Sequence, residues 1–228
     1  MVAHTCRICG LNFSYEPVFY AGTLQEVITR KYCDECIPRM EAKGSMAAAE
    51  NVAQEREKAW LEICPPPYRE TDAVRLPMNP APLAKVLKWK GGGSRGIALA
   101  GATGVGKTRA MFLLLHRLHW EGHHVTAVTA KRFERYVHQM FEKDNEARDM
   151  IRRAHRADIL YIDDIGKEKY TERVESEFHD LIETRTANLR PILWTANSNG
   201  TGLEAMMSPE RVAPILRRLR EFTEIITL

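Results

Sequence analysis

The stretch GATGVGKT at residues 101–108 has the composition and spacing of a loop that binds the phosphates of a nucleotide. Its glycines allow backbone N–H groups to turn inward around the phosphates, and the start of the following helix adds its partial positive charge. Lys107 is expected to reach the β- and γ-phosphates, and the Thr108 hydroxyl to ligate Mg²⁺. The predicted nucleotide-binding residues are Gly101, Ala102, Thr103, Gly104, Val105, Gly106, Lys107, Thr108 and Arg109.

Two adjacent carboxylates end the apolar run ILYIDD at residues 159–164. An acidic residue at the end of such a strand helps to hold Mg²⁺ in phosphate-loop enzymes, and we assign that role to Asp163. Asp164 would then orient and deprotonate a water molecule for attack on the γ-phosphate. The pair favours hydrolysis over a small-molecule kinase, whose site must exclude water. The alternative is that Asp164 caps the loop or pairs with Lys167 or Lys169.

A third polar residue, Asn197, closes the run PILWTAN at residues 191–197. If its strand lies beside the strands that carry the loop and the acid, its side chain faces the γ-phosphate and could hold the attacking water. Because NSNG is rich in turn-forming residues, Asn197 could equally be a turn residue. The spacing leaves both interpretations open.

Four of the five cysteines form two CxxC pairs, separated by the 23 residues from Gly10 to Tyr32. Four thiolates in this arrangement suit tetrahedral Zn²⁺, and a hairpin and a short helix at residues 23–32 fit within the spacer. Such a site is structural, since four protein ligands leave no open position. His4 could substitute as a ligand, and an iron–sulfur cluster or a labile disulfide pair are the alternatives. The predicted zinc ligands are Cys6, Cys9, Cys33 and Cys36.

The elements that must position these residues alternate between strand and helix from residue 95 onward. This order predicts an α/β fold with a parallel sheet covered on both faces. Within 131–157 we expect two helices, the first with an apolar face of Phe133, Tyr136, Val137, Met140 and Phe141. The strands are expected at 96–102, 124–130, 159–164, 191–197 and 223–228, and the other helices at 107–120 and 172–189.

Composition divides the chain into three parts, and 228 residues suffice for one core and a small appendage. We predict a zinc-binding, partner-docking domain at 1–40, a helical and proline-rich linker at 41–70, and an ATPase domain at 71–228. Six prolines between residues 64 and 82 exclude a continuous helix there. No apolar run approaches the roughly 20 residues that span a bilayer, and the N-terminus does not read as a secretory signal, so a cytoplasmic protein is expected.

The stretches GATGVGKT, DILYIDDIGKEKYTERVESEFHDLIETR and ILWTANSNG together resemble the AAA+ ATPases of the DnaC/IstB type, which are helicase loaders and transposition helpers. PPPYRETD also resembles the start of that family's ATPase core. The resemblance covers about residues 65 to 228. It implies a RecA-like AAA+ core, ATP and Mg²⁺, and a homo-oligomeric ring or spiral with ATP between subunits. It also places Asn197 at the sensor-1 position.

The resemblance implies an arginine near the C-terminus that reaches into the neighbouring subunit's site. The family pattern selects Arg218, with Arg217 second, although a solvated basic helix face is the alternative. It gives no position for the second sensor arginine, which most AAA+ proteins carry in a helical lid. Lys107, Asp164, Asn197 and Arg218 are the predicted catalytic residues.

The helical segment between the second and third core strands corresponds to the element that contacts single-stranded DNA in the family. Eight basic and five acidic residues give it a charge of +3, from eight minus five, and a salt-bridged surface is the alternative. The basic residues are Lys131, Arg132, Arg135, Lys143, Arg148, Arg152, Arg153 and Arg156.

The resemblance therefore predicts an ATP-dependent loader that binds a replicative helicase, through its zinc module, and delivers it to single-stranded DNA. An IstB-like transposition helper that binds duplex DNA and recruits a transposase is the nearest alternative. A nucleotide-gated zinc adaptor with negligible turnover, and a zinc module that binds DNA, also stay open. A phage origin is a further expectation.

Overall fold

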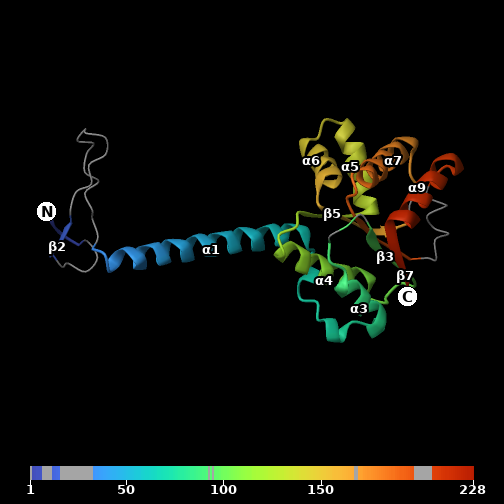
Figure 1. Ribbon diagram of the computed structural model, residues 1–228. Coiled ribbons are helices and arrows are strands. Elements are labelled where there is room, and N and C mark those ends of the chain that lie inside the picture. The colour runs from blue at the N-terminus through green and yellow to red at the C-terminus, as the bar shows by residue number, and fades with distance from the viewer. Residues whose placement is uncertain are drawn as a thin grey trace. The chain divides into compact units, whose positions relative to one another are not determined.

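The computed structural model describes residues 2–6, 12–15, 33–91, 93, 95–166, 169–197 and 207–228 (Figure 1). It divides into two units, Met1–Lys58 and Ala59–Leu228. The first unit contains the antiparallel pair β1 (Val2–Thr5) and β2 (Asn12–Tyr15) and most of helix α1 (Cys36–Ile63). The helix predicted at residues 23–32 lies outside the described residues. The domain limits at residues 40 and 70 stay predictions.

Helix α1 begins before the helical and proline-rich linker predicted at 41–70. Its 28 residues begin at Cys36 and end two residues before the prolines at 65–67, which cannot donate helical hydrogen bonds. Short elements then lead into the α/β core: α2 (Pro66–Arg69), the 3₁₀ turn η1 (Ala73–Arg75) and α3 (Pro80–Lys88). Trp60 and Cys64, at the end of α1, are buried in the second unit.

The core of the second unit is a five-stranded parallel sheet with the spatial order β4-β5-β6-β3-β7. β3, which precedes the phosphate loop, thus lies between β6 and β7, and β5 lies next to β6. In a parallel sheet the carboxyl ends of neighbouring strands meet at one edge, where ligands bind. The strands are β3 (Gly96–Ala100), β4 (Val125–Thr129), β5 (Ile159–Ile165), β6 (Ile192–Ala196) and β7 (Thr223–Thr227).

Helices cover both faces of the sheet, as the α/β prediction requires (Figure 1). α3 and α4 (Lys107–Trp120) lie on one face, and four of the helices in the described residues lie on the other. Alternate residues of a strand point to opposite faces, so Ile97 and Leu99 join the core under α4 while Ala98 joins the opposite core. The four helices are α5 (Ala130–Phe141), α6 (Asn145–Arg156), α7 (Glu172–Ala187) and α9 (Pro209–Phe222).

The predicted apolar face of α5 is confirmed except at its last residue. Phe133, Tyr136 and Val137 are buried, and Met140 packs against the same core. Phe141 is 53% exposed, and the guanidinium of Arg173 lies over its ring at 4.2 Å from the centroid. The prediction was wrong at Phe141 because the helix ends there, so its last side chain projects past the core.

Across the described ranges, no helix combines the length and apolar character needed to span a bilayer.

Candidate nucleotide-binding site

The loop between β3 and α4 has the tight backbone that its glycines predict. Gly104 and Gly106 have φ angles of 88° and 86°, in the left-handed region that side chains rarely adopt. A Cβ on Gly106 would also lie 3.3 Å from the ring of Pro77, so both conformation and space favour glycine. The loop ends directly at the first residue of α4, whose N-terminal N–H groups are suited to binding phosphate.

Lys107 is held in place by oxygen atoms of residues that directly follow two neighbouring strands, β3 and β6. Its ammonium group is 3.0 Å from the carbonyl oxygen of Gly101, 2.7 Å from that of Ala102 and 2.9 Å from Oδ1 of Asn197. The side chain is almost fully buried, so its charge sits at the base of the loop rather than in bulk water. This places the cation where an anionic ligand in the loop would meet it.

The carboxylate of Asp163 accepts three hydroxyl hydrogen bonds at one oxygen. Oδ1 lies 2.6 Å from the hydroxyl of Tyr161, 2.5 Å from that of Thr195 and 3.0 Å from that of Thr108. Burial and the Asp163 charge hold the pKa of Tyr161 well above its ordinary value, so Tyr161 stays a neutral donor. The carboxylate is thereby fixed beside the first turn of α4.

The pair of Thr108 and Asp163 fits the magnesium role predicted for it. Neighbouring ligands in an octahedral Mg²⁺ site, at 2.0–2.1 Å from the ion, lie about 3 Å apart. The separation of 3.0 Å between Thr108 Oγ1 and Asp163 Oδ1 matches that spacing. Both are hard oxygen donors, which Mg²⁺ prefers.

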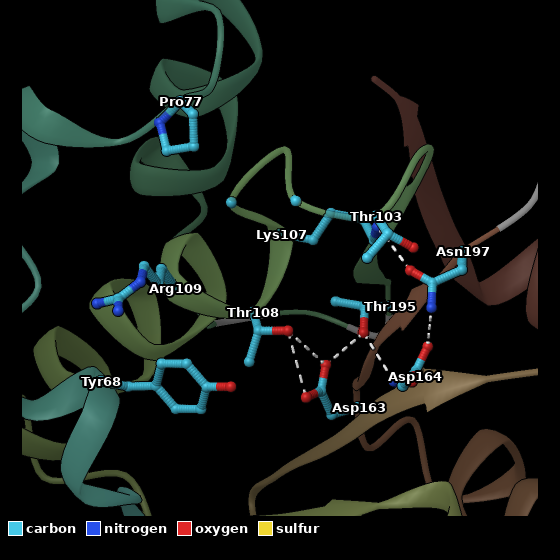
Figure 2. Close-up of a pocket in the computed structure, with 12 residues that line it drawn as sticks. Tyr68, Pro77, Thr103, Lys107, Thr108, Arg109, Asp163, Asp164, Thr195 and Asn197 are labelled. Carbon is cyan, nitrogen blue, oxygen red and sulfur yellow. Dashed lines mark hydrogen bonds between the residues drawn. The ribbon is translucent and has the colours of Figure 1, made fainter.

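Asp164 turns out of the strand with a φ of 61°, a conformation that aspartate tolerates better than most residues. Its backbone N–H donates to Thr195 Oγ1 at 2.8 Å. Its carboxylate accepts a hydrogen bond from the side-chain amide of Asn197 (Figure 2). The strained turn thus directs the second carboxylate toward Asn197 rather than along the strand.

These side chains line one pocket of about 340 Å³ at the carboxyl ends of β3, β5 and β6 (Figure 2). Of the predicted residues, Thr103, Gly104, Gly106, Lys107, Thr108, Arg109, Asp163, Asp164 and Asn197 line it. Gly101 and Ala102 contribute carbonyl groups to Lys107 instead, and Val105 lies in the turn between them and the helix.

Three further lining residues were missed by the sequence-based prediction: Tyr68, Pro77 and Thr195. Thr195 stands two residues before Asn197 in the same strand, so the alternation of strand side chains was the available signal. Tyr68 and Pro77 come from the proline-rich connector, where nothing local indicated that the chain folds back over the loop.

The predicted arginine finger does not line this pocket. Arg218 lies on α9, and its guanidinium pairs with Glu183 of α7 at 2.8 Å. Its neighbour Arg217 is exposed. A role for either residue at a nucleotide therefore requires a second copy of the chain, as the resemblance implies.

Three of the four predicted zinc ligands come together in the first unit. The sulfur atoms of Cys6, Cys33 and Cys36 all lie within 4.8 Å of one another. The backbone N–H of Cys36 donates to the carbonyl of Cys33 at 3.0 Å, which turns both thiols to the same side. Thiolates bound to one tetrahedral Zn²⁺ at about 2.3 Å lie roughly 3.8 Å apart, so the cluster fits that ion. Cys9 lies outside the described residues.

A family model matches residues 81–213, more than half of the chain, and its description is the ATPase domain of bacterial DnaA. The chain belongs to this DnaA ATPase domain family. Membership confirms the AAA+ ATPase class that the resemblance implied.

A curated protein is similar to part of the chain. A protein of Escherichia coli K12, YdaV, described as uncharacterized, is 24% identical over 120 residues. That match covers 53% of this chain and 48% of YdaV, so the chain spans about half the length of this curated relative.

Solved structures share the fold at low sequence identity. DnaA from Aquifex aeolicus bound to AMPPCP has a TM-score of 0.53 and 18% identity, over 64% of this chain and 44% of that one. A crystal structure of DnaI has a TM-score of 0.57 and 19% identity, over 75% of this chain and 93% of DnaI. The DnaC helicase loader has a TM-score of 0.54 and 17% identity, over 75% of this chain and 99% of the loader chain. The family member thus has the AAA+ fold of these proteins.

Proposed function

We propose that this chain is a Mg²⁺-dependent ATPase that loads a replicative helicase onto single-stranded DNA. The observation that carries the proposal is the continuous set of hydrogen bonds from Lys107 through Asn197 to Asp164. These bonds join the Lys107 ammonium, which would bind phosphate, to the Asp164 carboxylate through the Asn197 amide. That amide can also hold a water molecule between the γ-phosphate and Asp164.

The chain's own residues would divide the work as follows. The loop N–H groups and Lys107 bind the β- and γ-phosphates and compensate the charge that spreads over the γ-phosphate oxygens. Thr108 and Asp163 would hold Mg²⁺, which supplies further charge stabilisation when bound. Asp164 orients the attacking water and takes its proton, and Asn197 fixes both the carboxylate and the water.

Replacing the proposed base tests hydrolysis. Asp164→Asn is expected to lower the rate of ATP hydrolysis at least about 100-fold and to leave ATP affinity nearly unchanged, because the lost function acts on water and not on the phosphates. Phosphate release and binding of a fluorescent ATP analogue measure the two effects. Asp180→Asn, an exposed carboxylate on α7, is the matched control. Hydrolysis at the wild-type rate in Asp164→Asn would refute the proposal.

We propose that the active form is an oligomer in which Arg218, or Arg217, completes the neighbouring site. A guanidinium supplied in trans would stabilise the γ-phosphate charge in the transition state. Arg218→Ala and Asp164→Asn are each expected to be inactive alone. Mixed together, they should recover part of the activity, because some interfaces then combine a wild-type Asp164 with a wild-type Arg218. No recovery at any mixing ratio would contradict this arrangement.

Single-stranded DNA is proposed to contact α6 and the end of α5. Arg148, Arg152 and Arg156 stand four residues apart and line a groove of about 780 Å³. Phe141 lines a separate pocket together with Arg173, whose guanidinium lies 4.2 Å from the ring centroid, and the exposed part of the ring offers a surface on which a base can stack. Cations along a groove and an accessible aromatic ring are features of sequence-tolerant single-strand binding.

The helicase partner is proposed to bind through the cysteine module. A pull-down with ATP and Mg²⁺ from a lysate of the source organism, analysed by mass spectrometry, tests this proposal. The full chain should recover a hexameric replicative helicase, and the variant with Cys33→Ser and Cys36→Ser should not. Recovery of a transposase instead would favour the IstB-like alternative.

A further inference from the structure

The connector between α1 and the ATPase core supplies one wall of the nucleotide pocket. Tyr68, on the short helix α2, lines the pocket beside Thr108, Arg109 and Asp163. Figure 2 shows its hydroxyl directed to the side on which Thr108 and Asp163 lie. The proposed roles of the phosphate loop and the two aspartates do not use this residue.

The ring of Tyr68 is fixed by contacts to α4. It stacks on Phe112 with a centroid distance of 5.0 Å and an interplanar angle of 13°. The guanidinium of Arg109 lies 5.6 Å from the ring centroid, and it reaches Thr71 Oγ1 at 3.4 Å. Burial and the nearby Asp163 charge raise the pKa of Tyr68, so the hydroxyl stays a donor at neutral pH.

The same short segment is tied to the end of α1. The guanidinium of Arg69 donates to the carbonyl of Cys64 at 2.9 Å and to that of Leu61 at 2.7 Å. Leu61 lies in the last turn of α1 and Cys64 directly follows the helix, where carbonyls lack intrahelical partners. Arg69 therefore positions α2, and with it Tyr68, relative to the C-terminal end of α1.

We propose that Tyr68 binds the Mg²⁺–nucleotide complex through its hydroxyl. Arg69 is then a positioning residue: by holding α2 against the end of α1, it sets where the Tyr68 hydroxyl lies. The proposal rests on the proposed ATPase function. Mg²⁺ dehydrates reluctantly and keeps several waters when it is held by a carboxylate and phosphates. A phenol donor beside Asp163 faces that hydrated side, whereas Lys107 and the loop face the phosphates.

Removing only the hydroxyl tests the first part. In the full chain, Tyr68→Phe keeps the stacking on Phe112, so the fold is expected to persist. The Kd for a fluorescent ATP analogue should rise about fivefold in Mg²⁺ and stay unchanged in EDTA, since one hydrogen bond is lost only when the ion is present. Tyr136→Phe is the matched control, because its hydroxyl accepts from Arg132 on the opposite face of the sheet.

The possible outcomes separate the inference from the proposed function. An unchanged Kd in Mg²⁺, or equal weakening with and without Mg²⁺, would overturn the role of the Tyr68 hydroxyl. Failure of the wild-type chain to bind the analogue at all would overturn the proposed function, and the inference with it.

The positioning role of Arg69 has its own test. Arg69→Ala should raise the Kd about two- to fivefold in Mg²⁺ and not in EDTA, although Arg69 itself does not line the pocket. Arg75→Ala, a similarly exposed arginine on η1, should leave both values unchanged. A wild-type Kd for Arg69→Ala would refute the connection to α1 and leave the contact of Tyr68 intact.

Discussion

At the scale of single residues, the hydroxyl of Thr195 joins the two aspartates of the site. It donates to Asp163 Oδ1 at 2.5 Å and accepts from the Asp164 N–H at 2.8 Å. Thr195 is fully buried at the end of β6, so no water can replace these bonds without rearrangement. As a donor, the Thr195 hydroxyl thus orients Asp163, the proposed magnesium ligand. As an acceptor, it stabilises the turn at Asp164, the proposed base.

We expect Thr195→Val to lower kcat for ATP hydrolysis by at least tenfold. The valine keeps the shape of the side chain but removes both hydrogen bonds, which leaves the Asp164 N–H buried and unsatisfied. Steady-state hydrolysis and thermal unfolding would measure the effect. Thr195→Ser, which keeps the hydroxyl, should retain most of the activity. Similar rates for valine and serine would show that the bridge is unimportant.

The thiol of Cys64 should be unreactive at neutral pH. Burial raises the pKa of Cys64 to about 11, above the ordinary thiol value, so the folded state binds this proton more tightly than the unfolded state. The thiol's contribution to stability is therefore fully present below the ordinary thiol pKa and is lost as pH rises toward about 11. Peptide mapping after iodoacetamide treatment at pH 8 should show little alkylation of Cys64 until the chain is unfolded.

At the scale of elements, Arg185 of α7 connects three segments of the second unit. Its buried guanidinium donates to the carbonyls of Ala154, Ala157 and Pro191 at 2.8–2.9 Å. Burial lowers the pKa of Arg185 to about 10, so the side chain still carries its charge at neutral pH. The end of α6 and the start of β6 are thereby fixed to α7.

Arg185→Met should destabilise the second unit by about 3 kcal/mol, because several buried carbonyls would lose their donor. Urea unfolding monitored by circular dichroism would give the difference. Arg135→Met, on an exposed position of α5, is the control and should change the free energy of unfolding by less than about 0.5 kcal/mol. Equal stability of the two variants would refute the structural role of Arg185.

The end of α5 is expected to bind a nucleobase. Phe141→Ala should weaken binding of an oligo-dT strand about 5- to 150-fold, since stacking of one base contributes roughly 1–3 kcal/mol. Fluorescence anisotropy at fixed ionic strength would measure the affinity. Leu189→Ala removes an equally exposed apolar side chain beyond the end of α7 and should have no effect. Equal losses in both variants would argue against a specific platform at Phe141.

At the scale of the whole molecule, the two units separate the predicted metal module from the nucleotide pocket. The described members of the cysteine cluster belong to Met1–Lys58, whereas every residue that lines the pocket belongs to Ala59–Leu228. The predicted binding of metal and the proposed binding of nucleotide can therefore be tested independently in one chain.

We expect the purified chain to contain about one zinc ion, held by the four predicted thiolates. The variant with Cys33→Ser and Cys36→Ser should lose the metal, as measured by atomic emission, while its ATP affinity stays within about twofold of the wild type because the pocket lies in the other unit. Zinc retained in this variant would exclude the predicted ligand set. An iron signal in the wild type would favour the alternative that the cysteines bind an iron–sulfur cluster.

Most of the site was predictable from sequence because it depends on short, contiguous motifs. The phosphate loop requires glycine φ angles and a following helix, both encoded locally. Adjacent aspartates at the end of an apolar strand fix the position of Asp163, and the alternation of strands and helices fixes the fold class. For Asn197 the strand pattern left a site role and a turn role open, and only the resemblance favoured the first; it lies 2.9 Å from Lys107 because parallel strands bring their carboxyl ends to one edge.

The sequence by itself therefore predicted the chemistry: which residues would bind phosphate, ligate a cation and activate water. The tertiary structure decided what surrounds them. Only the order of the strands places Thr195 between the two aspartates, and only the return of the connector over α4 brings Tyr68 to the pocket. It also decided that Phe141 faces solvent beside Arg173. Such contacts join residues far apart in the chain, and burial and packing select them rather than any local pattern of residue types.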